Sequence, residues 1–153
     1  MKRVAWLSAF ALFLGACGTS LGPVDDRLVD LLANQARWDS SGPASYVYGV
    51  ERLCFCSPDY LGPVRVTVAN GVAVEHVYID SGLDVPPTIA QAFPTVDGLF
   101  ALLRSAIESD AFEITVTYDP TLGVPLDFWI DYNQMLADEE LGMQVTEAVT
   151  PTP

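Results

Sequence analysis

Alternating apolar and polar residues predict six strands along the chain. Side chains alternate across a strand, so residues two apart share one face of a sheet. The alternating segments are rich in valine, isoleucine and aromatic residues, which suit a half-buried pleated surface. The predicted strands are residues 46–56, 64–69, 72–79, 112–118, 124–132 and 143–149. Asn70-Gly71, between the second and third segments, is a strong signal for a two-residue hairpin.

Helical spacing of apolar residues occurs twice. Leu28, Leu31 and Leu32 predict a helix over residues 25–38, which Ser40-Ser41-Gly42-Pro43 ends. Thr95 is a suitable N-cap for a second helix. The apolar stripe of that helix would be Val96, Leu99, Phe100, Leu103 and Ile107.

The predicted order is αβββαβββ. This order favours a single α+β domain, with a twisted antiparallel sheet of about six strands and both helices on one face. The later strands divide their residues between the two faces. The residues expected to face inward are Phe112, Ile114, Val116, Tyr118, Leu126, Phe128 and Ile130. Those expected to face outward include Glu113, Asp127, Trp129 and Asp131.

The strand predicted over Tyr46–Cys56 is the best candidate for the centre of the sheet. Its alternation puts Arg52, Cys54 and Cys56 on one face. Leu53 and Phe55 fall on the other face, and we expect them to point into the core.

The spacing of Cys54 and Cys56 leaves their chemistry open. Two residues along a regular strand span roughly 6.6 Å, whereas the Cβ atoms of a disulfide lie about 3.8 Å apart. A disulfide therefore needs a bend, and Ser57-Pro58 is a plausible place for the chain to break. Inert thiols, a redox pair with Arg52 favouring the thiolate, and a metal site are the alternatives.

The N-terminus has the pattern expected of an export signal. Lys2 and Arg3 precede an apolar run over residues 4–14 that is too short to span a bilayer. Leu14-Gly15-Ala16-Cys17 resembles the lipobox of bacterial lipoproteins, which are acylated on the cysteine and cleaved just before it. An ordinary secretory signal cleaved nearby is the alternative.

The lipobox resemblance implies a domain organisation and a destination. Residues 1–16 would be the signal peptide, 17–24 a flexible tether, 25–149 the folded domain and 150–153 a disordered tail. The acyl chains on Cys17 would hold the chain at the membrane of the bacterial cell envelope. Gly18 in the next position favours the outer membrane or the cell surface over the inner membrane.

Charge narrows the choice of partners. The chain has a net charge of −13, and loss of Lys2 and Arg3 with the leader takes it to −15. This excess of negative charge argues against binding nucleic acid, whose phosphates are also negative. It is compatible with a soluble exported domain or with a cationic partner. Export also favours a disulfide, because acylation of Cys17 leaves Cys54 and Cys56 with only each other.

Three segments together resemble a known family. They are Tyr48 with Arg52-Leu53-Cys54-Phe55-Cys56, then residues 94–100, then Tyr118-Asp119 with Gly123, Pro125 and Asp131. These residues resemble the bacterial proteins catalogued as domain of unknown function 6174, which are typically exported and often lipoproteins. The family has no established activity, so the resemblance implies no catalytic residue and no cofactor. This chain departs from the family at Leu122 and Val124, where members often have a second aromatic residue.

Few residues are candidates for chemistry. Glu113, Asp119, Asp127 and Asp131 are expected to gather near exposed Trp129, as a solvated acidic face or as ligands of a cation. The single histidine, His76, is expected to be a packed or surface residue rather than a ligand. The chain has no Gly-rich phosphate loop and no Gly-x-Ser-x-Gly motif.

These observations leave three hypotheses. The first is a non-enzymatic, lipid-anchored envelope protein that binds another envelope protein through its open sheet face, where Trp129 would anchor the partner. The second is a thiol redox or metal-handling lipoprotein that uses Cys54, Cys56 and Arg52. The third is a hydrolase that acts through the acidic face, which would need carboxylates in a cleft.

Overall fold

The computed structural model describes residues 25–136 and 138–153. The predicted signal peptide, Cys17 and the tether lie outside the described residues. In the described part of the chain, no helix is long and apolar enough to cross a membrane.

Six antiparallel strands form one sheet, as the alternation predicts. The sheet order is β3-β2-β1-β6-β5-β4, so β1 and β6 are its two central strands. The strands are β1 (Tyr46–Leu53), β2 (Val64–Ala69), β3 (Val72–Tyr78), β4 (Glu113–Tyr118), β5 (Pro125–Asp131) and β6 (Leu141–Pro151). Asn70 and Gly71 both have positive φ, which is the backbone that the predicted two-residue hairpin between β2 and β3 requires.

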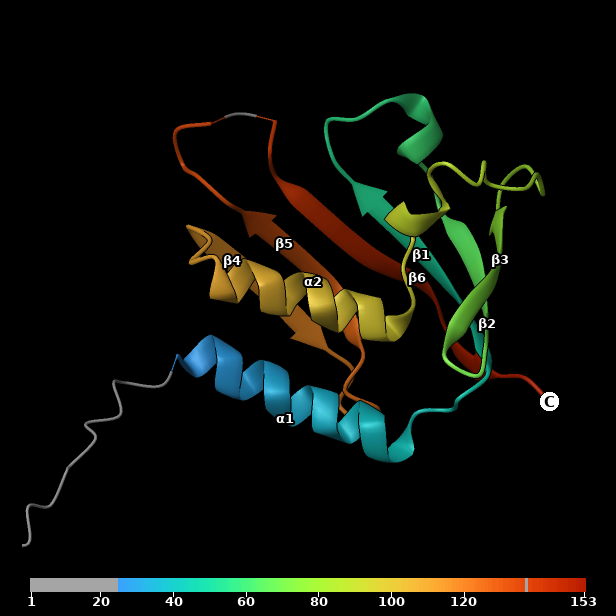
Figure 1. Ribbon diagram of the computed structural model, residues 1–153, viewed down its shortest axis with the longest axis horizontal. Coiled ribbons are helices and arrows are strands. Elements are labelled where there is room, and N and C mark those ends of the chain that lie inside the picture. Colours follow the sequence, from blue (N-terminus) through green and yellow to red (C-terminus); the bar gives the residue numbers. More distant parts are fainter. Residues whose placement is uncertain (1–24, 137) are drawn as a thin grey trace, which may run out of the picture.

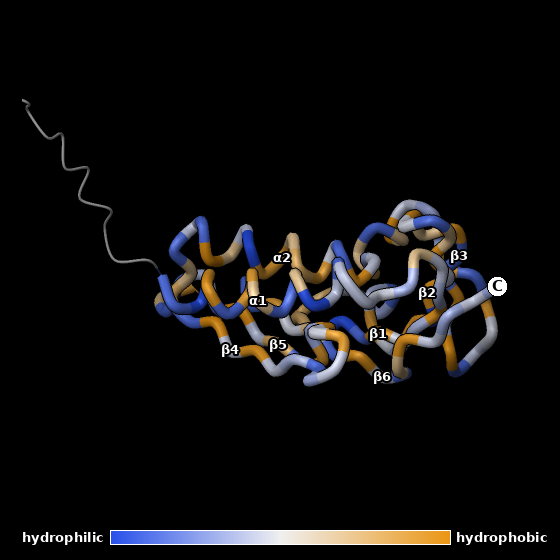
Figure 2. Tube along the Cα trace, turned by 90° about the horizontal axis from the view of Figure 1, so that it is seen from below, coloured by the Kyte–Doolittle hydropathy of each residue, from blue (hydrophilic) through white to orange (hydrophobic). Residues whose placement is uncertain are grey.

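Both helices lie on one side of the sheet (Figures 1 and 2). α1 spans Asp26–Ser41, and the Asp25 side chain caps it by accepting a hydrogen bond from the backbone of Arg27. α2 spans Val96–Glu108 and is capped by Thr95, as predicted. The predicted element order and the α+β class are confirmed. α1 runs three residues beyond its predicted end, because Ser40 and Ser41 remain helical.

The core lies between the helices and the covered face of the sheet, which we call the inner face. The predicted stripe of α2 is buried in it, together with the valines of β2. Irregular segment 85–94 covers the half of the inner face that the helices do not, through buried Val85 and Phe93. Figure 1 shows this segment beside β1 and β3.

Three apolar side chains lie where the sequence did not predict them. Leu53, Phe55 and Phe112 are expected in the core, but they are 37%, 85% and 53% exposed. β1 ends at Leu53, and its buried side chains on the inner face are Tyr46, Tyr48 and Val50. The tyrosines tolerate burial because their hydroxyls have partners: Tyr46 accepts from the Val96 N–H, and Tyr48 donates to the Pro94 carbonyl.

The C-terminal residues also differ from expectation. Residues 150–153 are predicted to be a disordered tail, but β6 continues to Pro151, which lies opposite Tyr46. The Thr152 N–H donates to the Ser45 carbonyl at 3.0 Å. β6 pairs with the full length of β1, and this pairing holds the C-terminal residues in the centre of the sheet. The alternation in residues 143–149 predicts a strand but does not show how far its pairing with β1 extends.

Candidate functional site

The face of the sheet opposite the helices, which we call the outer face, carries two acidic rows on either side of Trp129. In the first row, Asp127 and Glu51 flank Gln144 of β6. In the second, Glu113 and Asp131 lie directly opposite each other on β4 and β5. Trp129 lies between the rows because it is two residues from each of its acidic neighbours on β5.

Trp129 is fixed in place by its neighbours. It pairs with Gly142, which pairs in turn with Leu53. A Cβ on Gly142 would lie 2.7 Å from the indole ring and 2.9 Å from the Leu53 Cβ, so the ring lies across the glycine. The Trp129 side chain is still 40% exposed. Trp129 therefore presents a partly exposed aromatic surface that is held by its neighbours in the sheet.

No basic side chain in the described part of the chain forms a salt bridge with the acidic rows. Among the described residues, salt bridges involve only Arg27 and Arg65, and neither reaches Glu51, Glu113, Asp127 or Asp131. Like charges directly opposite each other, as at Glu113 and Asp131, are unfavourable in a sheet. The rows therefore form a surface of uncompensated negative charge around an aromatic ring.

Asp119 does not join these rows. Its carboxylate accepts hydrogen bonds from the backbone N–H groups of Thr121 and Leu122 and so holds the turn between β4 and β5. Among the described residues, no three His, Cys, Asp or Glu side chains converge in the way a metal ion needs. The carboxylates of the outer face are therefore spread along several strands.

A salt bridge crosses the outer face further along the sheet. Gly49 of β1 lies between Arg65 of β2 and Glu147 of β6. A Cβ on Gly49 would lie 2.9 Å from the Glu147 side chain, so the glycine leaves room for the Arg65 guanidinium to reach Glu147 at 2.6 Å. This hydrogen-bonded pair lowers the pKa of Glu147 and raises the pKa of Arg65.

Cys54 and Cys56 are joined by a disulfide. The strand ends at Leu53 and the chain bends, which brings the two Cα atoms to 5.4 Å. The cysteines thus lie just beyond β1 rather than on it. The redox and metal-handling roles of this pair stay predictions.

Arg52 is the last inner-face residue of β1, beside the disulfide. Its side chain is half-buried, and its Nε atom is buried without a hydrogen-bond partner among the described residues. Burial lowers the pKa of Arg52, and the nearby Tyr60 and Tyr132 hydroxyl groups oppose that effect.

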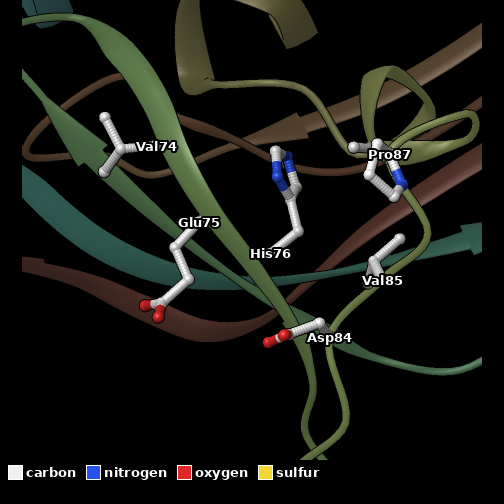
Figure 3. Close-up of a pocket in the computed structure, with 7 residues that line it drawn as sticks. Val74, Glu75, His76, Asp84, Val85 and Pro87 are labelled. Carbon is white, nitrogen blue, oxygen red and sulfur yellow. The ribbon is translucent and has the colours of Figure 1, made fainter.

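A cavity of about 400 Å³ lies between β3 and the segment that follows it, and His76, the only histidine of the sequence, lines it. Glu75 and Asp84 extend their carboxylates to the same side of it, whereas the His76 ring points away from them (Figure 3). His76 Nε2 is 2.9 Å from the Phe93 carbonyl, which can only accept, so this nitrogen carries the proton. His76 therefore tethers the segment that covers the inner face, in keeping with a packed residue.

Comparison with known proteins identifies the family. A model described as a family of unknown function (DUF6174) matches residues 30–150. The chain belongs to this family. No curated protein and no solved structure matches it.

The DUF6174 match confirms the resemblance seen in the sequence and assigns no activity. Within this DUF6174 domain, alternation correctly placed Glu113, Asp127, Trp129 and Asp131 on one exposed face. Alternation did not predict that Glu51 belongs to the acidic rows. It also did not predict that the Trp129 indole packs across Gly142. Only strand register puts Gly142 beside Trp129 and Glu51 across Gln144 from Asp127, because these residues lie on three different strands.

Proposed function

We propose that this protein is an exported lipoprotein, acylated on Cys17, that binds a positively charged protein partner of the bacterial envelope through its outer face. The lipobox supports the anchor. The acidic rows around Trp129 support the binding surface, and they are the observation that carries the proposal.

The chemistry of the outer face favours lysine and arginine side chains on the partner. Trp129 is flanked by Asp127 and Asp131 on its own strand. Glu113 lies on the neighbouring strand β4, and Glu51 lies two strands away on β1, beyond Gln144 of β6. A cationic side chain over the indole would gain a cation–π interaction and would lie between carboxylates. An exposed, pre-ordered tryptophan is also a residue type that dominates binding energy in protein interfaces.

The net negative charge of the whole chain also favours a positively charged partner. A net charge of −13 creates a field that attracts a cationic partner over distances up to about 10 Å at ordinary salt. Electrostatic complementarity of this kind raises the association rate and excludes acidic partners. Acylation at Cys17 would add a second effect, since it confines the protein to a surface where its partner is concentrated.

Site-specific photocrosslinking in cells tests the binding surface. A photoreactive residue in place of Thr115, which pairs with Trp129 on the outer face, should capture one basic protein. The same group in place of Ser105, an exposed residue of α2, is the control. Equal capture at both positions would contradict the proposal.

A charge-neutralised variant sharpens this test. Asp127→Asn with Asp131→Asn should weaken binding of the captured partner by about tenfold or more at low salt and by much less at high salt. Asp26→Asn with Glu108→Gln removes two charges from the helices and should leave binding within about twofold. Equal weakening by both pairs would show that net charge, not the outer face, directs binding.

Mass spectrometry tests the anchor separately. The protein from membranes should begin at Cys17 and carry the mass of its acyl chains. Cys17→Ser should abolish this modification and release the folded domain from the membrane fraction. An unmodified, uncleaved leader in the wild-type chain would rule out the anchor without affecting the proposal for the outer face.

A further inference from the structure

The cavity beside β3 lies where the chain stops pairing with the edge of the sheet. β3 is an edge strand, and the segment after it returns along its outer edge as far as Asp84 and Val85. Asp84 forms a bridge with Val77, and the Val85 N–H donates to the His76 carbonyl at 3.0 Å. Residues 86–87 are both proline, which has no backbone N–H to continue the pairing. The segment therefore leaves the strand, and the cavity lies between the two.

The size and the lining of this cavity suit a small organic molecule. Sites for such ligands have volumes of roughly 300–1,000 Å³, with mostly apolar walls and a few polar groups. The cavity beside β3 has a volume of about 400 Å³. Its apolar lining residues are Val74, Val85, Pro87 and Ala90. Its polar lining residues are Glu75, His76 and Asp84. A ligand with a hydrocarbon part and one charged end would match this division.

The two carboxylates of the cavity lie on the same side of it. Asp84 is opposite Val77, which is two residues from Glu75, so Asp84 and Glu75 are diagonal neighbours on one face of the strand pair. Figure 3 shows both carboxylates extending to that side. Such diagonal neighbours lie about 7–8 Å apart, a separation that one ammonium group can bridge with two hydrogen bonds. The Thr67 hydroxyl donates to one oxygen of Glu75 at 3.0 Å and so holds this side chain in place.

The charge of the cavity favours an organic cation. In the part of the chain that the structure describes, neither Glu75 nor Asp84 forms a salt bridge. The His76 ring points away from both carboxylates, and its Nε2 donates to the Phe93 carbonyl. The described residues bring no three His, Cys, Asp or Glu side chains together as a metal ion needs. The apolar walls also favour a ligand with a hydrocarbon part over a bare ion.

We propose that the cavity beside β3 binds an alkylammonium group. Glu75 and Asp84 accept hydrogen bonds from the ammonium, and the apolar lining surrounds the hydrocarbon chain. β3 is at the opposite edge of the sheet from β4, and β5 is the neighbour of β4. The site is therefore separate from the acidic rows around Trp129, and it does not depend on the function proposed for them.

Histidine NMR tests this directly, because His76 lines the cavity and is the only histidine of the sequence. The chain as isolated from cells, without a histidine tag, is labelled with ¹³C-histidine and titrated with n-pentylammonium chloride at constant pH and ionic strength. The His76 ring signals should shift and saturate. Pentanol, which lacks the charge, should bind at least about tenfold more weakly. Shorter alkylammonium ions should bind up to about fourfold more weakly for each methylene removed.

Two charge-neutralised variants locate the binding. Glu75→Gln with Asp84→Asn should weaken n-pentylammonium binding by at least about tenfold, and both side chains are exposed, so the variant should fold normally. The matched control, Asp127→Asn with Asp131→Asn, removes the same charge from the outer face and should keep binding within about twofold. Equal weakening by both pairs would show an effect of net charge and overturn the proposal. So would equal binding of pentanol, or His76 signals that never saturate.

A second ligand separates two sources of the same group. An alkylammonium ends both a free amine and a lysine side chain, so Nα-acetyl-lysine methylamide is titrated in the same way. Weaker binding than n-pentylammonium would assign the cavity to a free amine, and tighter binding would assign it to a lysine of a peptide. Failure of both ligands to bind would overturn this proposal and would leave the photocrosslinking test of the outer face unaffected.

Discussion

The two faces of β5 differ although their residues alternate along a single strand. Phe128 and Ile130 point to the helices and are 2% and 0% exposed. Asp127, Trp129 and Asp131 point the other way and remain wholly or partly accessible. The inner residues meet a packed layer, whereas both helices leave the outer residues uncovered.

This difference separates stability from binding. Burial of large apolar side chains on the inner face supplies most of the favourable free energy of folding. The outer face includes features that oppose folding, such as Glu113 directly opposite Asp131. Because the inner face compensates for them, the outer face can keep charges that oppose folding.

The largest expected effect comes from adjacent residues of β5. Phe128→Ala should lower the free energy of unfolding by about 3–5 kcal/mol, because it leaves a cavity in a packed core. Trp129→Ala should lower it by only about 1 kcal/mol, through loss of the ring that covers Gly142. Urea unfolding of both variants measures the two losses of unfolding free energy. Similar losses would show that the outer face is as important to the fold as the inner face.

A second prediction concerns alkaline pH and the inner-face tyrosines. Burial raises the pKa of Tyr46 to about 12, with the negative charge of Asp97 adding to this and the Val96 N–H opposing it. An unfolded tyrosine loses its proton near pH 10. Between about pH 10 and 12 the unfolded state therefore binds fewer protons, and stability falls as the pH rises. Burial raises the pKa of Tyr118 to about 12 as well, so both residues contribute.

Tyr46→Phe should reduce this loss. In the variant, the slope of unfolding free energy against pH should be shallower by about 1.4 kcal/mol per pH unit. The variant should also be less stable at neutral pH by about 1 kcal/mol, because the Val96 N–H loses its acceptor. Trp129→Phe, on the outer face, is the control and should keep the wild-type slope. A wild-type slope in Tyr46→Phe would contradict the assignment.

The smallest expected effect is on the outer face, at the salt bridge over Gly49. Arg65→Gln should lower the free energy of unfolding only slightly, because both side chains are more than a third exposed and water screens their attraction. Arg65 lowers the pKa of Glu147. The contribution is therefore present above the ordinary glutamate pKa and disappears as the pH falls through the lowered value. A double-mutant cycle with Glu147→Gln, repeated in 1 M salt, isolates the interaction. A coupling that salt leaves unchanged would contradict this account.

The fold was largely predictable because most of its signals are local. Alternation identified all six strands, Asn70-Gly71 identified the hairpin, and Thr95 identified the start of α2. Leu53 and Phe55 were assigned to the core by hydropathy alone. That assignment failed because Tyr46 and Tyr48 occupy the core instead, through hydroxyl partners on distant segments that no local pattern indicates.

The candidate site was predictable only in part. Trp129 and its acidic neighbours on β5 follow from alternation within one strand. The bend that allows the Cys54–Cys56 disulfide does not, since it depends on where β1 leaves the sheet. The absence of a partner for Arg52 among the described residues is also invisible in the sequence, because any of the many carboxylates could have reached it.

The sequence by itself determined which residues alternate and where the chain turns, because these depend on side chains a few positions apart. The tertiary structure decided which face of each strand is covered and which residues of different strands become neighbours. Those outcomes depend on register and on the packing of distant segments. They place Glu51 across Gln144 from Asp127, Gly142 beneath the Trp129 ring, and Arg52 apart from every described carboxylate.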